Sequence, residues 1–179
     1  MARESARLRL ARRLEAPFRA LGWLCGACVL AVVLLTFALV AMRYGAGRGS
    51  IAAQELVLHL NAVAFMLGGA WTLLRDGHVR VDVLQQRWSP RTRARVELAG
   101  LLFLLLPFCA VLFWTSLDYV AASWRLREAS REVGGLPGLY LVKALIPVSA
   151  LLLASAGLVR GLRLDFAGEG RERRAGPTA

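Results

Sequence analysis

Polar side chains capable of chemistry gather in three segments of the chain. In sequence order they are Gln54, Glu55 and His59; His78, Arg80 and Asp82; and Ser123, Glu128, Ser130 and Lys143. Charged groups of both signs, without the groups of a catalytic pocket, suit contact between protein surfaces better than catalysis. Two interpretations are open for each segment: a collar of ion pairs that fixes the order of the helices, or a docking site for another subunit.

The histidines do not provide a haem site. His59 and His78 are the only two in the chain. They are 19 residues apart in the sequence. On one helix this separation corresponds to about 28 Å, which places the two histidines near opposite faces of a membrane. A haem-carrying helix bundle needs two histidines at matched depth, so haem is excluded unless partner subunits supply the ligands.

The cysteines do not indicate redox chemistry either. Cys25 and Cys28 form a C-x-x-C inside an apolar segment, and Cys109 is alone in another. A reactive thiolate needs a polar, electropositive setting. A quinone-linked thiol oxidoreductase needs a second cysteine pair at the opposite face. We therefore predict three small apolar core residues, and no cofactor, metal ion or catalytic residue.

Four long apolar segments must position the polar residues. Ala20–Met42 has 23 residues, Leu56–Leu74 has 19, Leu98–Leu117 has 20 and Leu139–Val159 has 21, with Lys143 as the only charge among them. About 20 helical residues cross a hydrocarbon core of about 30 Å, and in lipid a helix satisfies its own backbone. The sequence predicts an all-α membrane protein with four transmembrane helices.

The arginines are distributed unevenly among the ends and linkers. Six precede the first span, two follow it, six follow the second, three follow the third and five lie in the tail. This alternation is the positive-inside pattern, and it predicts that both termini and the 75–97 loop are cytoplasmic. The net charge of +11 does not indicate nucleic acid binding, because no basic patch is interleaved with aromatic residues. The first apolar run is too long for a signal peptide, so we expect a retained first helix.

The chain is expected to divide into three parts. Residues 1–19 form a basic cytoplasmic lead-in along the anionic membrane surface. Residues 20–160 form the four-helix transmembrane domain. Residues 161–179, rich in Gly, Arg and Glu, form a cytoplasmic tail that we expect to be disordered.

Local signals predict where individual helices begin. Ser50 is a good N-cap for the second helix, and Ser89-Pro90 is typical of the start of the third. The third helix is expected to continue to about Arg127. Its length would then be ~55 Å, so that it projects beyond the bilayer. Pro107 is expected to kink it.

A short amphipathic helix is expected between the second and third spans. Val81, Leu84 and Trp88 fall on one helical face, whereas Asp82 and the neighbouring glutamines fall elsewhere. This pattern predicts a helix lying in the cytoplasmic interface, with Trp88 as its anchor.

The spans contain no evident path for an ion or a substrate. A proton-coupled exporter needs an ionisable group deep in the bilayer. Glu55 and Lys143 lie close to the outer ends of their spans, where long side chains can reach the interface. On its own, the chain therefore lacks a transport pathway.

Several motifs taken together resemble a known family. The most specific is His78-Val79-Arg80-Val81-Asp82, directly after the second span. The others are Arg43-Tyr44, the segment from Ser50 to Leu56, Gly68-Gly69-Ala70, Ser89-Pro90-Arg91, Pro107-Phe108, Ser123 with Glu128 and Ser130, Gly134-Gly135-Leu136-Pro137, Lys143 and Pro147. Over roughly residues 18–162, the chain resembles the small integral-membrane subunit (DctQ-type) of tripartite ATP-independent periplasmic (TRAP) transporters.

The resemblance implies a non-catalytic small permease subunit in the bacterial inner membrane. In such a transporter a large membrane subunit holds the substrate and sodium sites and moves as an elevator, and a periplasmic binding protein delivers an organic acid. The small subunit packs beside the large one and enlarges its scaffold. The implied partners are the large subunit, the binding protein and the lipid bilayer, and not nucleic acid. The alternatives are a membrane anchor of a respiratory oxidoreductase and an independent small transporter.

Overall fold

Helices make up almost all of the described chain. The computed structural model describes residues 2–75, 77 and 88–174. The helical elements are α1 (Ala2–Gly45), α2 (Ile51–Leu74), α3 (Pro90–Gly100), the π-helical turn η2 (Leu101–Leu105), α4 (Leu106–Arg125) and α5 (Leu139–Arg174). Among the described residues, extended pairing is limited to one isolated bridge between Ala129 and Pro137. The predicted all-α class is confirmed.

Four helical stretches of the described chain are long and apolar enough to cross a membrane. They are Glu15–Gly45, Ile51–Leu74, Arg91–Arg125 and Leu139–Leu162. Large apolar side chains project from them into the surroundings, among them Trp23, Phe37, Phe65, Phe103 and Trp114. A water-facing surface would not carry so many exposed aromatic and aliphatic groups, so the prediction of four helices long and apolar enough to span a membrane is confirmed.

Two predicted helix starts have the expected caps. The Ser50 hydroxyl accepts a hydrogen bond from the N–H of Ala53 at 3.3 Å. The Ser89 hydroxyl accepts one from the N–H of Thr92 at 3.2 Å, with Pro90 as the first helical residue. Each cap satisfies one of the N–H groups that the first turn of a helix leaves without a partner.

The third span is continuous from α3 through η2 to α4, but it is not uniform. The N–H of Leu106 donates to the carbonyl of Leu101, five residues back. Pro107 follows directly, and a proline ring clashes with the carbonyl four residues before it and has no N–H to donate. The wider π-helical turn accommodates this, so a π-bulge lies directly before Pro107, where a kink is expected.

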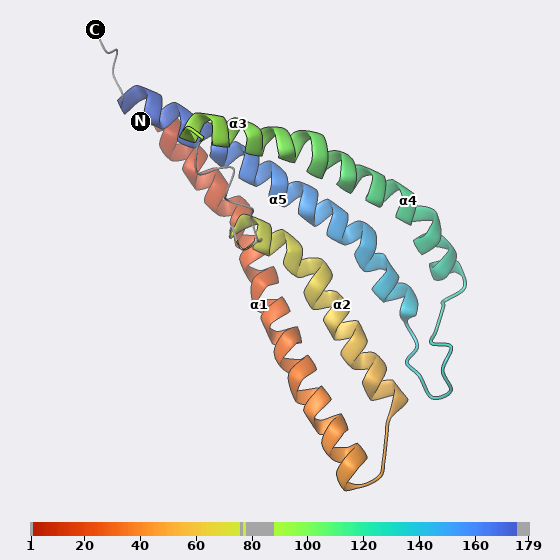
Figure 1. The fold of residues 1–179 in the computed structure, drawn as a ribbon. Helices are drawn as coiled ribbons and strands as arrows, with labels where there is room; N and C mark the ends of the chain where they lie inside the picture. Colours follow the sequence, from red (N-terminus) through yellow and green to blue (C-terminus); the bar gives the residue numbers. More distant parts are fainter. Residues whose placement is uncertain (1, 76, 78–87, 175–179) are drawn as a thin grey trace.

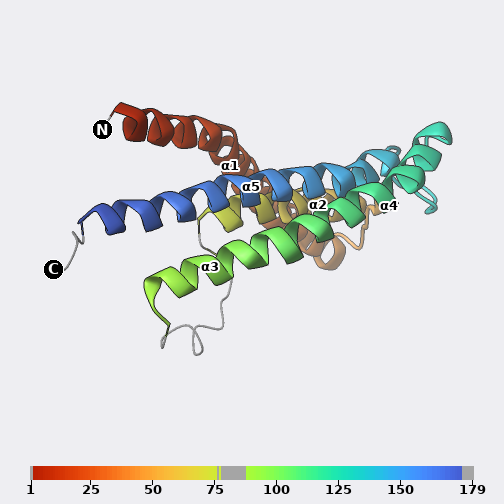
Figure 2. The ribbon, with the colours of Figure 1, turned by 90° about the horizontal axis from the view of Figure 1, so that it is seen from above.

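The helices lie side by side in a different order from their order in the chain. Helix α2 packs against both α1 and α5, and α5 packs against α4. Figure 1 shows the resulting series α1, α2, α5, α4, with the two hairpins spreading apart toward their connecting loops. Figure 2 shows the same helices from above, with α1 and α3 on opposite sides of α5. Helix α2 is therefore flanked on two sides and keeps an open outer face.

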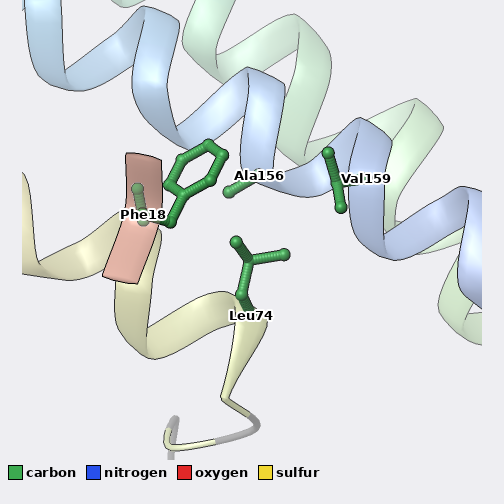
Figure 3. Close-up of a cluster of buried hydrophobic side chains, with 5 residues drawn as sticks. Phe18, Leu74, Ala156 and Val159 are labelled. Carbon is green, nitrogen blue, oxygen red and sulfur yellow. The ribbon is translucent and has the colours of Figure 1, made fainter. Parts of the chain in front are cut away.

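The core lies where α1, α2 and α5 converge. It contains Phe18, Ala70, Leu74, Ala156 and Val159. In Figure 3 the Phe18 ring points between α2 and α5, toward Leu74 and Ala156. The alanines allow the helix backbones to approach closely, which is the usual basis of helix association in membranes.

A glycine of α1 is required for close packing of the first hairpin. A Cβ atom on Gly22 would lie 2.6 Å from Nε1 of Trp71. No atom lies within 4 Å of the equivalent position on Gly26, one turn further along. The indole of Trp71 therefore occupies the space that Gly22 leaves, and Gly26 faces outward.

Two sequence predictions are not settled by these elements. The amphipathic helix expected around residues 81–88 lies outside the described residues except for Trp88. Helix α5 continues past residue 160, where we expect the tail to begin, as far as Arg174. The division into lead-in, transmembrane domain and tail stays a prediction, because helix continuity does not say which residues lie in lipid.

Candidate functional site

The loop between α4 and α5, residues 126–138, has a defined fold of its own. The N–H of Ser130 donates to the carbonyl of Leu136 at 3.1 Å. Gly134 and Gly138 have φ values of 83° and 105°, in the left-handed region that glycine adopts without strain. The backbone therefore turns sharply twice and returns alongside itself.

Glu55, at the start of α2, holds this loop. The Ser130 hydroxyl donates to Oε1 of Glu55, and the N–H of Leu136 donates to Oε2 at 2.6 Å. Gly135 lies so close that a Cβ atom there would be 2.8 Å from Oε2 of Glu55 and would also collide with the Ser130 side chain. Figure 1 shows the loop reaching the start of α2. The glycine makes room for the carboxylate.

Glu128 joins the same loop to α4 and α5. Its Oε2 accepts hydrogen bonds from the Ser123 hydroxyl at 2.7 Å and from Nζ of Lys143 at 2.5 Å. The Lys143 ammonium also lies over the Tyr119 ring, 4.3 Å from its centroid, a cation–π geometry. The hydrogen bonds from Lys143 and Ser123 hold the pKa of Glu128 below its ordinary value, because they stabilise the charged carboxylate.

These contacts form one assembly, which we name the loop clamp: Glu55, Ser123, Glu128, Ser130 and Lys143. Two segments far apart in the sequence supply it, because Glu55 comes from the first predicted polar segment and the other four from the third. Sequence analysis treated the two segments separately, and the structure brings them together. Each carboxylate is occupied by donors from its own chain.

The remaining predicted site residues lie elsewhere. Gln54 is exposed beside Glu55, and the half-buried His59 lies one turn further along α2. His78, Arg80 and Asp82 lie outside the described residues. Their role as a subunit contact or as a structural collar stays a prediction.

Sequence analysis missed a second polar assembly, at the opposite end of the spans. Arg160 is only 7% exposed. Its Nε donates to Oε1 of Glu97 at 2.7 Å and its Nη2 forms an ion pair with the same oxygen. Its Nη1 donates to the carbonyl of Leu73 at 2.7 Å. We name Arg160, Glu97 and the Leu73 carbonyl the arginine anchor.

The arginine anchor completes the C-terminus of α2. The last four carbonyls of a helix lack intrahelical donors and carry partial negative charge. Leu73 is among these residues of α2, so the Arg160 guanidinium both caps it and pairs with Glu97. In the sequence, Glu97 follows Arg91, Arg93 and Arg95, and nothing in its spacing points to Arg160. By sequence alone, Arg160 is one of the five arginines of the tail.

The charged groups of both assemblies are held by partners from this chain. Among the described residues, no three His, Cys, Asp or Glu side chains gather to hold a metal ion. Cys25, Cys28 and Cys109 are free and buried, as expected for small core residues. Both polar assemblies connect elements of this chain to one another.

The fold and these assemblies define a class: a multi-pass, all-helical membrane protein whose charges are concentrated at the ends of its spans. A sequence model of the family described as tripartite ATP-independent periplasmic transporters, DctQ component, matches residues 32–166. The chain belongs to this family, as the motifs predicted. A comparison with curated proteins finds no match.

Proposed function

We propose that this chain is the small permease subunit of a TRAP-type secondary transporter in the bacterial inner membrane. It packs against a large membrane subunit and enlarges the scaffold of that subunit. The transporter imports an organic acid, driven by sodium, after a periplasmic binding protein has delivered it. Membership of the DctQ component family is the observation that carries this proposal.

The placement of the charges supports an accessory role. Glu55 and Lys143 lie at the ends of their spans and are held by groups of the 126–138 loop. Arg160 lies at the other end and is held by Glu97. Carriers that move ions usually keep an ionisable group inside the membrane for this purpose. We infer that the substrate and the coupling ion bind to the large subunit, that this chain is not an enzyme and that it needs no cofactor.

The orientation that we propose follows from the arginines. The lead-in, the 75–97 loop and the tail carry 17 arginines, against five in the other two loops. Both termini are then cytoplasmic, the loop clamp faces the periplasm and the arginine anchor faces the cytoplasm. The segment containing His78, Arg80 and Asp82 lies at the cytoplasmic surface, where it orients the interfacial helix rather than contacting substrate.

Co-purification tests the proposal. This chain, carrying an affinity tag, is expressed together with a large TRAP membrane subunit from the same organism and purified in mild detergent. We expect the large subunit to elute with the tagged chain in a fixed ratio, and the binding protein to join when its organic acid is present. Recovery of the chain with flavin or iron–sulfur subunits instead would identify a respiratory anchor and contradict the proposal.

A further inference from the structure

Helix α2 carries an open stripe that combines large apolar side chains with two side-chain amides, neither of which bonds to another described residue. We name Gln54, Leu58, Asn61, Phe65 and Gly69 the α2 stripe. They recur at spacings of three and four residues, and so lie on one face of the helix. Leu58 is 65% exposed and Phe65 83%, and Gln54 and Asn61 are exposed as well. The stripe faces away from the contacts with α1 and α5.

Asn61 distinguishes this face from one that meets lipid. It lies six residues from Glu55, about 9 Å along the axis, and therefore inside the hydrocarbon layer. Its side-chain amide makes no hydrogen bond with the described residues. Hydrocarbon supplies no donor or acceptor, so an amide at this depth without a partner is costly.

Hydroxyl side chains in the same spans solve this problem locally. Thr72, Thr115, Ser116, Ser149 and Ser155 each donate to a carbonyl of their own helix, three or four residues back. Asn61 has no such bond with the described residues. Its donors and acceptor are therefore available to a neighbouring transmembrane helix, the usual role of asparagine within a membrane.

The shape of the stripe fits a partner different from this chain. Phe65 protrudes, and one turn away Gly69 is open, with no atom within 4 Å of a Cβ placed on it. Two copies in the same membrane are related by a two-fold axis along the membrane normal, which brings identical residues to face one another. Phe65 would then face Phe65, and the two rings would collide. Gly69 would face Gly69, and the two glycines would leave a gap between the helices.

We infer that the α2 stripe is the surface against which a transmembrane helix of the large subunit packs. That helix presents a small residue opposite Phe65, a bulkier one opposite Gly69 and a hydrogen-bonding side chain at the depth of Asn61. The inference rests on the proposed function, because it assigns the docking face of the same complex.

Site-specific photocrosslinking tests the assignment directly. A photoreactive phenylalanine analogue replaces Phe65 or, as the matched control, Phe37 of α1, which is 74% exposed. After irradiation of the intact complex in membranes, we expect a covalent product with the large subunit from position 65 and none from position 37. Crosslinking to lipid alone or to a second copy at position 65, or equal crosslinking to the large subunit at both positions, would overturn the inference.

Two substitutions test the same face by association. Gly69→Trp should abolish co-purification of the large subunit, whereas Gly26→Trp, at another glycine with no neighbour within 4 Å, should not. Asn61→Leu should weaken association about three- to twenty-fold, the range measured for side-chain hydrogen bonds in membranes. Thr36→Leu, at an exposed position of α1, should leave association unchanged.

The failure of this inference can be told from failure of the proposed function. If the wild-type complex forms and position 65 does not crosslink, the subunit role stands and the docking face is wrong. If the wild-type chain forms no complex with the large subunit, the proposed function itself fails. The amount of each variant in the membrane is measured alongside, so that loss of the chain is not mistaken for loss of binding.

Discussion

Glu55 and Ser130 lie 75 residues apart in the sequence, and a hydrogen bond from the Ser130 hydroxyl joins them. One is at the start of α2 and the other is in the loop before α5. Figure 1 shows that the two helical hairpins spread apart toward this end of the molecule. The loop clamp therefore connects the hairpins where helix packing does not.

Removing the Glu55 carboxylate should release the loop. In Glu55→Ala, the Ser130 hydroxyl and the Leu136 N–H lose their acceptor, so the loop should open more often. We expect trypsin to cleave after the exposed Arg131 several-fold faster in the purified protein. Gln54→Ala, at the exposed neighbouring position, is the control and should be cleaved at the wild-type rate. Equal rates for Glu55→Ala and wild type would show that the carboxylate does not hold the loop.

Acid should weaken the contact made by Glu128. Its pKa is lowered in the folded protein, first by the hydrogen bond from Lys143 and then by that from Ser123. A carboxyl group whose pKa is lower in the folded protein stabilises the fold at any pH above its pKa in the unfolded chain, which is about 4.3. This stabilisation is lost as the pH falls from about 4.3 through the lower pKa of the folded protein. Hydrogen-exchange protection of the 126–138 amides, corrected for intrinsic rates, should therefore fall in this window. Glu128→Gln should show lower protection at neutral pH and no such transition; a transition of the same size would assign it to another group.

Sequence reasoning succeeded where the signal was local. The four spans follow from run length, and the Ser50 and Ser89 caps from residue type and position. It failed where the signal was a contact between distant residues. Neither the Glu55–Ser130 bond nor the pairing of Arg160 with Glu97, 63 residues apart, has a sequence spacing that marks it. The order α1, α2, α5, α4 was equally hidden, because four apolar runs can pack in several orders.

The arginine anchor should contribute strongly to stability. Arg160→Leu removes the buried guanidinium that binds Glu97 and the Leu73 carbonyl, and removing one member of a buried pair costs about 3–5 kcal/mol. We expect the free energy of unfolding in mixed detergent micelles to fall by that amount. Arg48→Leu, at an exposed arginine, should change it by no more than about 0.5 kcal/mol. The double variant Arg160→Leu/Glu97→Leu should recover much of the loss; a single-variant loss below about 1 kcal/mol would place the pair among weak surface contacts.

Reporter fusions should reveal the proposed orientation. The distribution of arginines places both termini inside. A reporter active only in the periplasm should therefore be active when fused after Gly49 or Gly135, and inactive when fused after Ser89. A reporter active only in the cytoplasm should give the reverse. The opposite activity at any two of the three positions would rule the orientation out.

The central claim is that this chain supports transport without performing it, and uptake into liposomes tests it most directly. Vesicles containing this chain alone, the large subunit alone, or both are given an inward sodium gradient, the binding protein and a panel of labelled organic acids. We predict uptake of one class of acid when both membrane subunits are present, and none above empty vesicles with this chain alone. Sodium-driven uptake by this chain alone would contradict the account.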